Sequence, residues 1–249
     1  MDKKQKQALL WFLWGMALLL ALLAAFVPQP ERAVPTSAPQ SPGGYVALTF
    51  DDGPSGRFTR TLLKGLRDRD VRATFFLCGY RMEEYPELAD RIFQEGHEIG
   101  CHSYSHKEMA SMSRREIAEE IGKMRALLPE GCRLTFLRPP GGLSSDAVDQ
   151  VAGAQGLSIL SWSVDPRDWA TRDAHAVEQA VLRKVQDGDI ILLHDMSDSS
   201  VRAALDIVDA LQSRGFTFVT ASRLARLRGA RLRPGEAYTA FPPRAENIK

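Results

Sequence analysis

Short apolar runs alternate with amphipathic stretches along most of the chain after residue 44. These runs are four to eight residues long and consist mainly of apolar and β-branched residues. Strands that are buried on both faces of a parallel sheet have this composition. We therefore expect seven strands, at Tyr45–Phe50, Arg72–Leu77, Glu98–Cys101, Leu134–Leu137, Leu157–Val164, Asp189–Leu193 and Phe216–Val219.

The stretches between these runs carry helix signals. Ser113 and Glu116 form a capping box at the start of an expected helix over Arg114–Leu127. Three more helices, expected at Ser144–Ala154, Ala174–Gln186 and Ser200–Arg214, are each followed closely by a glycine. Strands that alternate with helices predict a parallel α/β sheet. We favour an irregular (β/α) barrel related to the TIM barrel, with about seven parallel strands, because no G-x-G-x-x-G motif of a dinucleotide-binding sheet follows the first strand.

The first apolar segment of the chain is longer than the others. Ala8–Val27 has no charged residue, and twenty residues at about 1.5 Å per residue reach roughly 30 Å, the thickness of a bilayer core. Lys3, Lys4 and Lys6 precede it and would stay in the cytoplasm. We predict a transmembrane signal-anchor helix, with the rest of the chain outside the cell. The alternative is a signal peptide that is cleaved, with secretion of the domain.

These patterns divide the chain into five parts. Residues 1–7 form a cytoplasmic stub, and residues 8–27 form the anchor. Residues 28–44 are rich in Pro, Ser, Gln and Gly, which predicts a flexible linker. Residues 45–230 contain all the expected strands and form the main domain. We expect the tail at residues 231–249 to pack loosely.

Composition and charge narrow the class of protein. The hydrophobic share of 44% and the charged share of 25% are typical of globular domains. A net charge of +1 gives no indication of a nucleic-acid partner, which would favour a strongly basic face. The cysteines are too few for a disulfide framework and lack the C-x2-C spacing of a zinc site, although one bridge with one free thiol stays open. They are Cys78, Cys101 and Cys132.

Polar residues that can carry chemistry follow five of the expected strands. In a parallel barrel the carboxyl ends of all strands meet at one face, where such folds build their active sites. Each motif alone has an ordinary structural explanation as a turn, a loop, a surface pair or a core residue, but their shared placement favours one site. The residues are Asp51 and Asp52, His102 and His106, Arg138, Asp165 and Asp168, and His194 and Asp195.

These residues first suggest a metal-binding site. His102 and His106 are four residues apart, so their imidazoles can converge on one ion. Zinc hydrolases commonly add a carboxylate and leave one position open for water. Because a turn follows the first strand, both Asp51 and Asp52 can reach one pocket. One carboxylate would then bind the metal while the other accepts a proton from water.

Five motifs in order resemble the polysaccharide deacetylase family, also called carbohydrate esterase family 4 or the NodB-homology domain. The resemblance covers about Tyr45–Leu227. The motifs are Thr49-Phe50-Asp51-Asp52-Gly53-Pro54, His102-Ser103-Tyr104-Ser105-His106, Arg138-Pro139-Pro140-Gly141, Asp165-Pro166-Arg167-Asp168-Trp169 and Leu192-Leu193-His194-Asp195.

The resemblance implies a distorted (β/α) barrel that uses a metal ion to hydrolyse N-acetyl groups on sugar polymers. It makes Asp52, His102 and His106 the metal ligands, with Zn²⁺ expected and Co²⁺, Ni²⁺ or Fe²⁺ left open. It also makes Asp51 the general base and His194 the general acid that protonates the leaving amine. Supporting residues are also implied: Arg138 to hold Asp51, Asp168 to orient His194, and Leu192 and Trp169 to line the acetyl pocket and groove wall.

Two positions depart from the family pattern. Gly141 stands where the family often has a tyrosine, which keeps the backbone N–H for the oxyanion but removes an aromatic wall. Cys101 stands before His102 where the family often has an asparagine, and we expect this thiol to be buried and inert. The alternatives are a stray metal ligand and an oxidation point.

An exported, membrane-tethered deacetylase would meet the cell wall first. We therefore expect N-acetylglucosamine residues of peptidoglycan as the substrate, with N-acetylmuramic acid or chitin-like oligomers as alternatives. Two other functions stay open, hydrolysis of small cyclic amides and a non-catalytic role in binding the cell wall.

Overall fold

The computed structural model describes residue 2 and residues 43–243. The expected anchor at Ala8–Val27 and most of the expected linker lie outside the described residues. Within the described ranges, no helix has the length and apolar character needed to cross a membrane.

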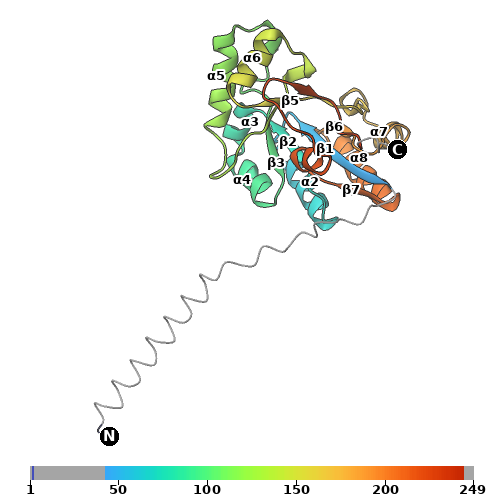
Figure 1. The fold of residues 1–249 in the computed structure, drawn as a ribbon. Coiled ribbons are helices and arrows are strands. Elements are labelled where there is room, and N and C mark those ends of the chain that lie inside the picture. Colours follow the sequence, from blue (N-terminus) through green and yellow to red (C-terminus); the bar gives the residue numbers. More distant parts are fainter. Residues whose placement is uncertain (1, 3–42, 244–249) are drawn as a thin grey trace. The chain divides into compact units, whose positions relative to one another are not determined.

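One parallel sheet forms the centre of the domain (Figure 1). Its strands follow the order β6-β1-β2-β3-β4-β5-β8, and β7 pairs with the first residues of β1. All seven expected strands are present, six of them with shifted ends, which confirms the predicted parallel α/β sheet. The strands are β1 (Gly44–Asp51), β2 (Thr74–Leu77), β3 (Glu98–Cys101), β4 (Phe136–Leu137), β5 (Ser158–Leu160), β6 (Ile190–His194), β7 (Phe216–Phe218) and β8 (Ala237–Tyr238).

The segment that follows β5 contacts β6. Val164 forms a parallel bridge with Ile191, and the backbone N–H of Leu192 donates to the carbonyl of Val164 at 3.0 Å. Because β6 lies at the other end of the strand order, this bridge brings the series β6-β1-β2-β3-β4-β5 round toward closure. The carboxyl ends of these strands therefore face a common space.

Helices flank the strands on both sides (Figure 1). Ser113 accepts a hydrogen bond from the N–H of Glu116 and completes the predicted capping box. The helix from Ala174 ends at Leu182, four residues before the expected end, and a turn in which Gln186 N–H donates to Asp189 leads into β6. The helices are α2 (Arg57–Asp68), α3 (Gly79–Glu84), α4 (Pro86–Gln94), α5 (Arg114–Arg125), α6 (Asp146–Ala154), α7 (Ala174–Leu182), α8 (Asp198–Ser213) and α9 (Ala221–Leu227).

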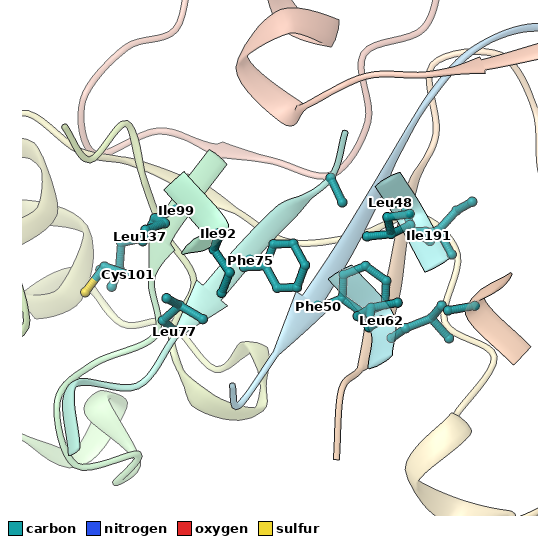
Figure 2. Close-up of a cluster of buried hydrophobic side chains, with 14 of the residues drawn as sticks. Leu48, Phe50, Leu62, Phe75, Leu77, Ile92, Ile99, Cys101, Leu137 and Ile191 are labelled. Atoms are coloured by element: carbon teal, nitrogen blue, oxygen red, sulfur yellow. The ribbon is translucent and has the colours of Figure 1, made fainter. Parts of the chain in front are cut away.

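Apolar side chains from neighbouring strands pack into the main core (Figure 2). The rings of Phe50 on β1 and Phe75 on β2 stack with centroids 5.1 Å apart. Leu62 from α2 and Ile191 from β6 belong to the same buried cluster. Burial of one such side chain contributes about 1.5–3 kcal/mol, so this core gives the strand ends a rigid base.

The expectation of a loosely packed tail is wrong for its first part. Ala237 and Tyr238 form β8, which pairs in parallel with β5. Phe241 is only 3% exposed, and its backbone N–H donates to the carbonyl of Gly188 at 2.8 Å. A two-residue strand has no periodicity to reveal it, so the sequence pattern gave no sign of this pairing.

Candidate active site

A cavity of about 350 Å³ lies at the carboxyl ends of the strands. Eight of the ten predicted site residues line it, and the other two, Arg138 and Asp168, contact lining residues from behind. The structure therefore brings all ten together from separate segments. The lining residues are Asp51, Asp52, His102, His106, Gly141, Trp162, Asp165, Trp169, Leu192 and His194.

The backbone after β1 explains how two consecutive aspartates reach one cavity. Asp51 is the last residue of β1, and Asp52 has a φ of 71°, in the left-handed region. In a continuous strand their side chains would point to opposite faces. The change of backbone direction at Asp52 turns both carboxylates toward the cavity.

Asp52, His102 and His106 form a cluster of three potential metal ligands. The Nε2 atoms of His102 and His106 lie 3.2 Å and 2.9 Å from the Asp52 Oδ1 atom. Their ligand atoms all lie within 4.8 Å of one another. Burial disfavours the carboxylate form of Asp52, but the two imidazoles outweigh it and hold its pKa well below the usual range.

The donor set fits a divalent metal ion. His102 Nδ1 lies 2.7 Å from the backbone carbonyl of Arg138, which can only accept a hydrogen bond, so Nδ1 carries the proton. Nε2 is therefore the nitrogen of His102 that faces the cluster, and it can bind a metal ion once it carries no proton. Asp52 Oδ1 is buried and has no hydrogen-bond donor in suitable geometry. An oxygen and imidazole nitrogens that converge in this way suit zinc and related divalent ions.

Asp51 is a buried carboxylate fixed by one arginine. Arg138 Nη1 donates to Asp51 Oδ1 at 2.7 Å, while Asp51 Oδ2 lies 3.7 Å from His102 Nε2. Arg138 is fully buried and also donates to Thr49 Oγ1 at 2.9 Å and to the carbonyls of Leu160 and Ser161, each at 2.8 Å. Burial lowers the pKa of Arg138, and the charge of Asp51 opposes that effect. Oδ2 of Asp51 is therefore left to face the metal cluster.

His194 and Asp168 form the second pair of groups at the cavity. The Asp168 Oδ1 atom lies 2.8 Å from His194 Nδ1, and Asp168 Oδ2 accepts the backbone N–H of His194 at 2.9 Å. Burial by itself would lower the pKa of His194, but the hydrogen bond and charge of Asp168 raise it to about 9. With Nδ1 engaged, the Nε2 atom of His194 is the one that can serve the cavity, and it carries a proton at neutral pH.

Two residues that line the cavity had no role assigned from the sequence. Trp162 lines the cavity, and its ring packs so closely on Gly142 that a Cβ atom there would lie 2.6 Å from the ring. An apolar ring after a strand looks like a core residue, so the sequence held no separate signal for it. Asp165 also lines the cavity, and its Oδ1 atom accepts the backbone N–H of Arg167 at 2.7 Å.

Asp195 also had no assigned role, although it belongs to one of the five motifs. Its side chain is fully buried and accepts a hydrogen bond from Thr59 Oγ1, while its other oxygen has no partner. Burial raises the pKa of Asp195 to about 7. Thr59 Oγ1 in turn accepts the N–H of Ser55 at 2.6 Å, which ties the turn after Asp52 to β6.

Cys101 is fully buried in the core, as expected. Burial raises the pKa of its thiol to about 12, so the reactive thiolate is scarce at neutral pH. Cys78, Cys101 and Cys132 all lie in the described part of the chain, and none forms a disulfide there.

Comparison with known proteins gives the same family on three grounds. The family model for polysaccharide deacetylase matches residues 38–160. A peptidoglycan-N-acetylglucosamine deacetylase of Bacillus cereus is 35% identical over 189 residues, which cover 74% of this chain and 89% of that protein. A family 4 acetyl xylan esterase from Clostridium thermocellum, solved with a cobalt ion, is 35% identical with a TM-score of 0.73; the match covers 80% of this chain and 99% of that one.

A third protein is much longer than the region it shares with this chain. The peptidoglycan-N-acetylmuramic acid deacetylase PdaC of Bacillus subtilis is 35% identical over 189 residues, which are 75% of this chain. This chain spans only about 40% of the length of PdaC. Its identity equals that of the N-acetylglucosamine deacetylase, so identity alone does not decide between the two sugars.

Proposed function

Because this chain belongs to the polysaccharide deacetylase family, we propose that it removes N-acetyl groups from a cell-wall polysaccharide by metal-dependent hydrolysis. The proposed substrate is peptidoglycan, at its N-acetylglucosamine residues, with release of acetate. The observation that carries the proposal is the convergence of Asp52, His102 and His106 in one cavity that Asp51 and His194 also line.

We propose that Asp52, His102 and His106 hold the metal ion, with zinc as the native ion. A divalent ion at this position supplies a Lewis acid that polarises the amide carbonyl and lowers the pKa of the attacking water. The cobalt ion in the acetyl xylan esterase supports a divalent ion in this family without deciding which one this chain uses.

Asp51 is the proposed general base. Arg138 binds Oδ1 and fixes the plane of the carboxylate, so Oδ2 is directed to the space where water attacks. Transfer of the water proton to Asp51 lets oxygen add to the carbonyl carbon. A positioned base of this kind typically contributes about 10²–10⁴-fold to the rate.

His194 is the proposed general acid. Amines leave poorly without a proton, and Asp168 keeps His194 protonated at neutral pH. His194 Nε2 gives its proton to the nitrogen as the carbon–nitrogen bond breaks, which yields acetate and the free amine. The backbone N–H of Gly141 is proposed as an oxyanion donor, and Leu192 and Trp169 are proposed as walls of the acetyl pocket.

Mass spectrometry of treated peptidoglycan tests the choice of sugar. Digestion of the product into disaccharides should show the loss of one acetyl group on the glucosamine and not on the muramic acid. Deacetylation confined to muramic acid would refute the first choice and favour the alternative. Activity on chito-oligomers alone would favour a chitin-like substrate.

We also propose that the protein is a single-pass protein of the cell membrane, with the catalytic domain outside. The support is the apolar segment Ala8–Val27 and the lysines before it. Fractionation of cells should recover the intact chain with the membrane. Recovery of a shortened chain in the medium would favour the cleaved signal peptide.

A further inference from the structure

A second cavity, of about 340 Å³, adjoins the catalytic cavity. It shares Asp52, Trp169 and His194 with the catalytic cavity, so the two are arms of one groove. The catalytic arm is defined by Gly141, Trp162 and Asp165, and the second arm is lined, beyond the shared residues, by Asp168, Thr171, Arg172, Met196, Ser197 and Ser200.

The two arms differ in charge. The catalytic arm is lined by three aspartates, two of which are assigned to catalysis and metal binding, and by no arginine or lysine. The second arm contains Arg172 and the residues Thr171, Ser197 and Ser200. Asp168 is the one carboxylate that lines the second arm and not the catalytic arm. It is buried, and both of its oxygens contact His194. The second arm is therefore suited to a ligand with an anionic group.

Arg172 is available to such a ligand. Its side chain is exposed, and among residues 43–243 it has no ion pair within 4 Å and no hydrogen bond. The carboxylates that share a neighbouring surface hollow with it have other partners: Asp173 caps α7 through Ala176 N–H at 3.0 Å, Asp198 pairs with Arg57 at 2.9 Å, and Asp206 pairs with Arg202 at 3.9 Å.

The second arm also has the apolar surface that sugar rings pack on. Trp169 is 61% exposed and Met196 is 36% exposed, two of the four large hydrophobic residues that are exposed in the described structure. Trp169 lines both arms, so it stands between the reacting sugar and its neighbour. An aromatic face beside a guanidinium and hydroxyls suits a sugar that also bears a carboxylate.

We propose that this second arm is a subsite for an acidic sugar next to the one that is deacetylated, with Arg172 pairing with its carboxylate. The proposal rests on the proposed function and makes it more specific. In peptidoglycan every second sugar is muramic acid, which carries a lactyl group. The carboxylate is either the free lactyl group or a carboxylate of the attached peptide, and both sources share the chemistry that Arg172 recognises.

Kinetics on three glycans test the subsite. The zinc-loaded full chain is assayed for acetate release from neutral chito-oligosaccharides, from glycan strands with free lactyl groups, and from strands that retain their peptides. Arg172→Gln should lower the ratio of kcat/KM for the charged glycan over the neutral one by about tenfold, because a charge-assisted contact is lost. The charged glycan for which the ratio falls identifies the source of the carboxylate.

Arg183→Gln is the matched control, since Arg183 is exposed, lies outside the groove and carries the same charge. This control should leave the ratio unchanged. High salt should reduce the preference of the unmodified protein for the charged glycan, but not that of Arg172→Gln. Arg172→Lys should recover part of the ratio. Equal ratios in Arg172→Gln and the unmodified protein would overturn the subsite and leave the proposed function intact. No acetate from any glycan would overturn both.

Discussion

At the scale of single residues, the pair of His194 and Asp168 sets when the proposed acid is protonated. Asp168 raises the pKa of His194 to about 9, against a burial effect that lowers it. Asp168→Asn removes the charge that raises this pKa, and burial remains. We therefore expect the alkaline limb of the kcat/KM profile to move to lower pH by roughly one unit or more. An alkaline limb at the same pH in Asp168→Asn would contradict the assignment of His194 as the acid.

The identities of the site residues were open to prediction because they are polar and follow strands. Asp51, Asp52, His102 and His106 stand out against apolar neighbours. Trp162 could not be found in this way, because an aromatic residue at the end of a strand is as typical of a core as of a groove. The contact of Arg138 with Asp51 was expected only from the family resemblance, because the residue pattern alone does not determine the placement of β4 relative to β1.

At the scale of elements, a hydrogen-bond chain joins α2 to the strand ends. Thr59 on α2 donates to Asp195 after β6 and accepts the N–H of Ser55 after β1. Thr59→Val keeps the shape of the side chain and leaves two buried polar groups without partners. We expect a loss of about 1–3 kcal/mol in the free energy of unfolding, measured by urea denaturation.

Thr61→Val on the same helix is the control. Thr61 is exposed, and its hydroxyl donates to the carbonyl of Arg57 one turn earlier. Its replacement should change the free energy of unfolding by less than about 0.5 kcal/mol. Equal effects of the two substitutions would show that the chain from α2 to β6 does not stabilise the turn after Asp52.

Strands and helices differed in how far the sequence predicted them. The capping box at Ser113 and the short run Glu98–Cys101 were sufficient to locate α5 and β3. The expected strand at Leu157–Val164 keeps regular pairing only up to Leu160, and Val164 then bridges to β6. The residues between Leu160 and Val164 continue the apolar pattern of β5, so this pattern could not show where β5 ends.

At the scale of the whole molecule, the C-terminal segment belongs to the domain. Phe241 is buried in the cluster that contains Ile190 and Leu160, beside the strands that carry His194 and bind Arg138. Phe241→Ala should lower the free energy of unfolding by about 3–5 kcal/mol, as measured by urea denaturation. A change below about 1 kcal/mol would show that the segment is not part of the cooperative core.

The site as a whole combines three parts, the proposed metal cluster, base and acid, which are held by two buried residues. The metal cluster is supported by the Arg138 carbonyl, the base by the Arg138 guanidinium, and the acid by Asp168. Arg138 therefore links the metal ligands to the base, while the acid is positioned from β6 and the segment after β5. This arrangement places the proposed base and acid in one cavity with the proposed metal ligands, as hydrolysis of an amide requires.

Acetate release from peptidoglycan, before and after chelation, tests this account most directly. The purified protein should release acetate, lose the activity with a chelator and regain it with added zinc. Asp51→Asn should still bind zinc in a metal-content assay, yet release acetate about 10²–10⁴-fold more slowly. Release that persists in a metal-free protein, or a fully active Asp51→Asn variant, would contradict the metal-dependent hydrolysis proposed for this site.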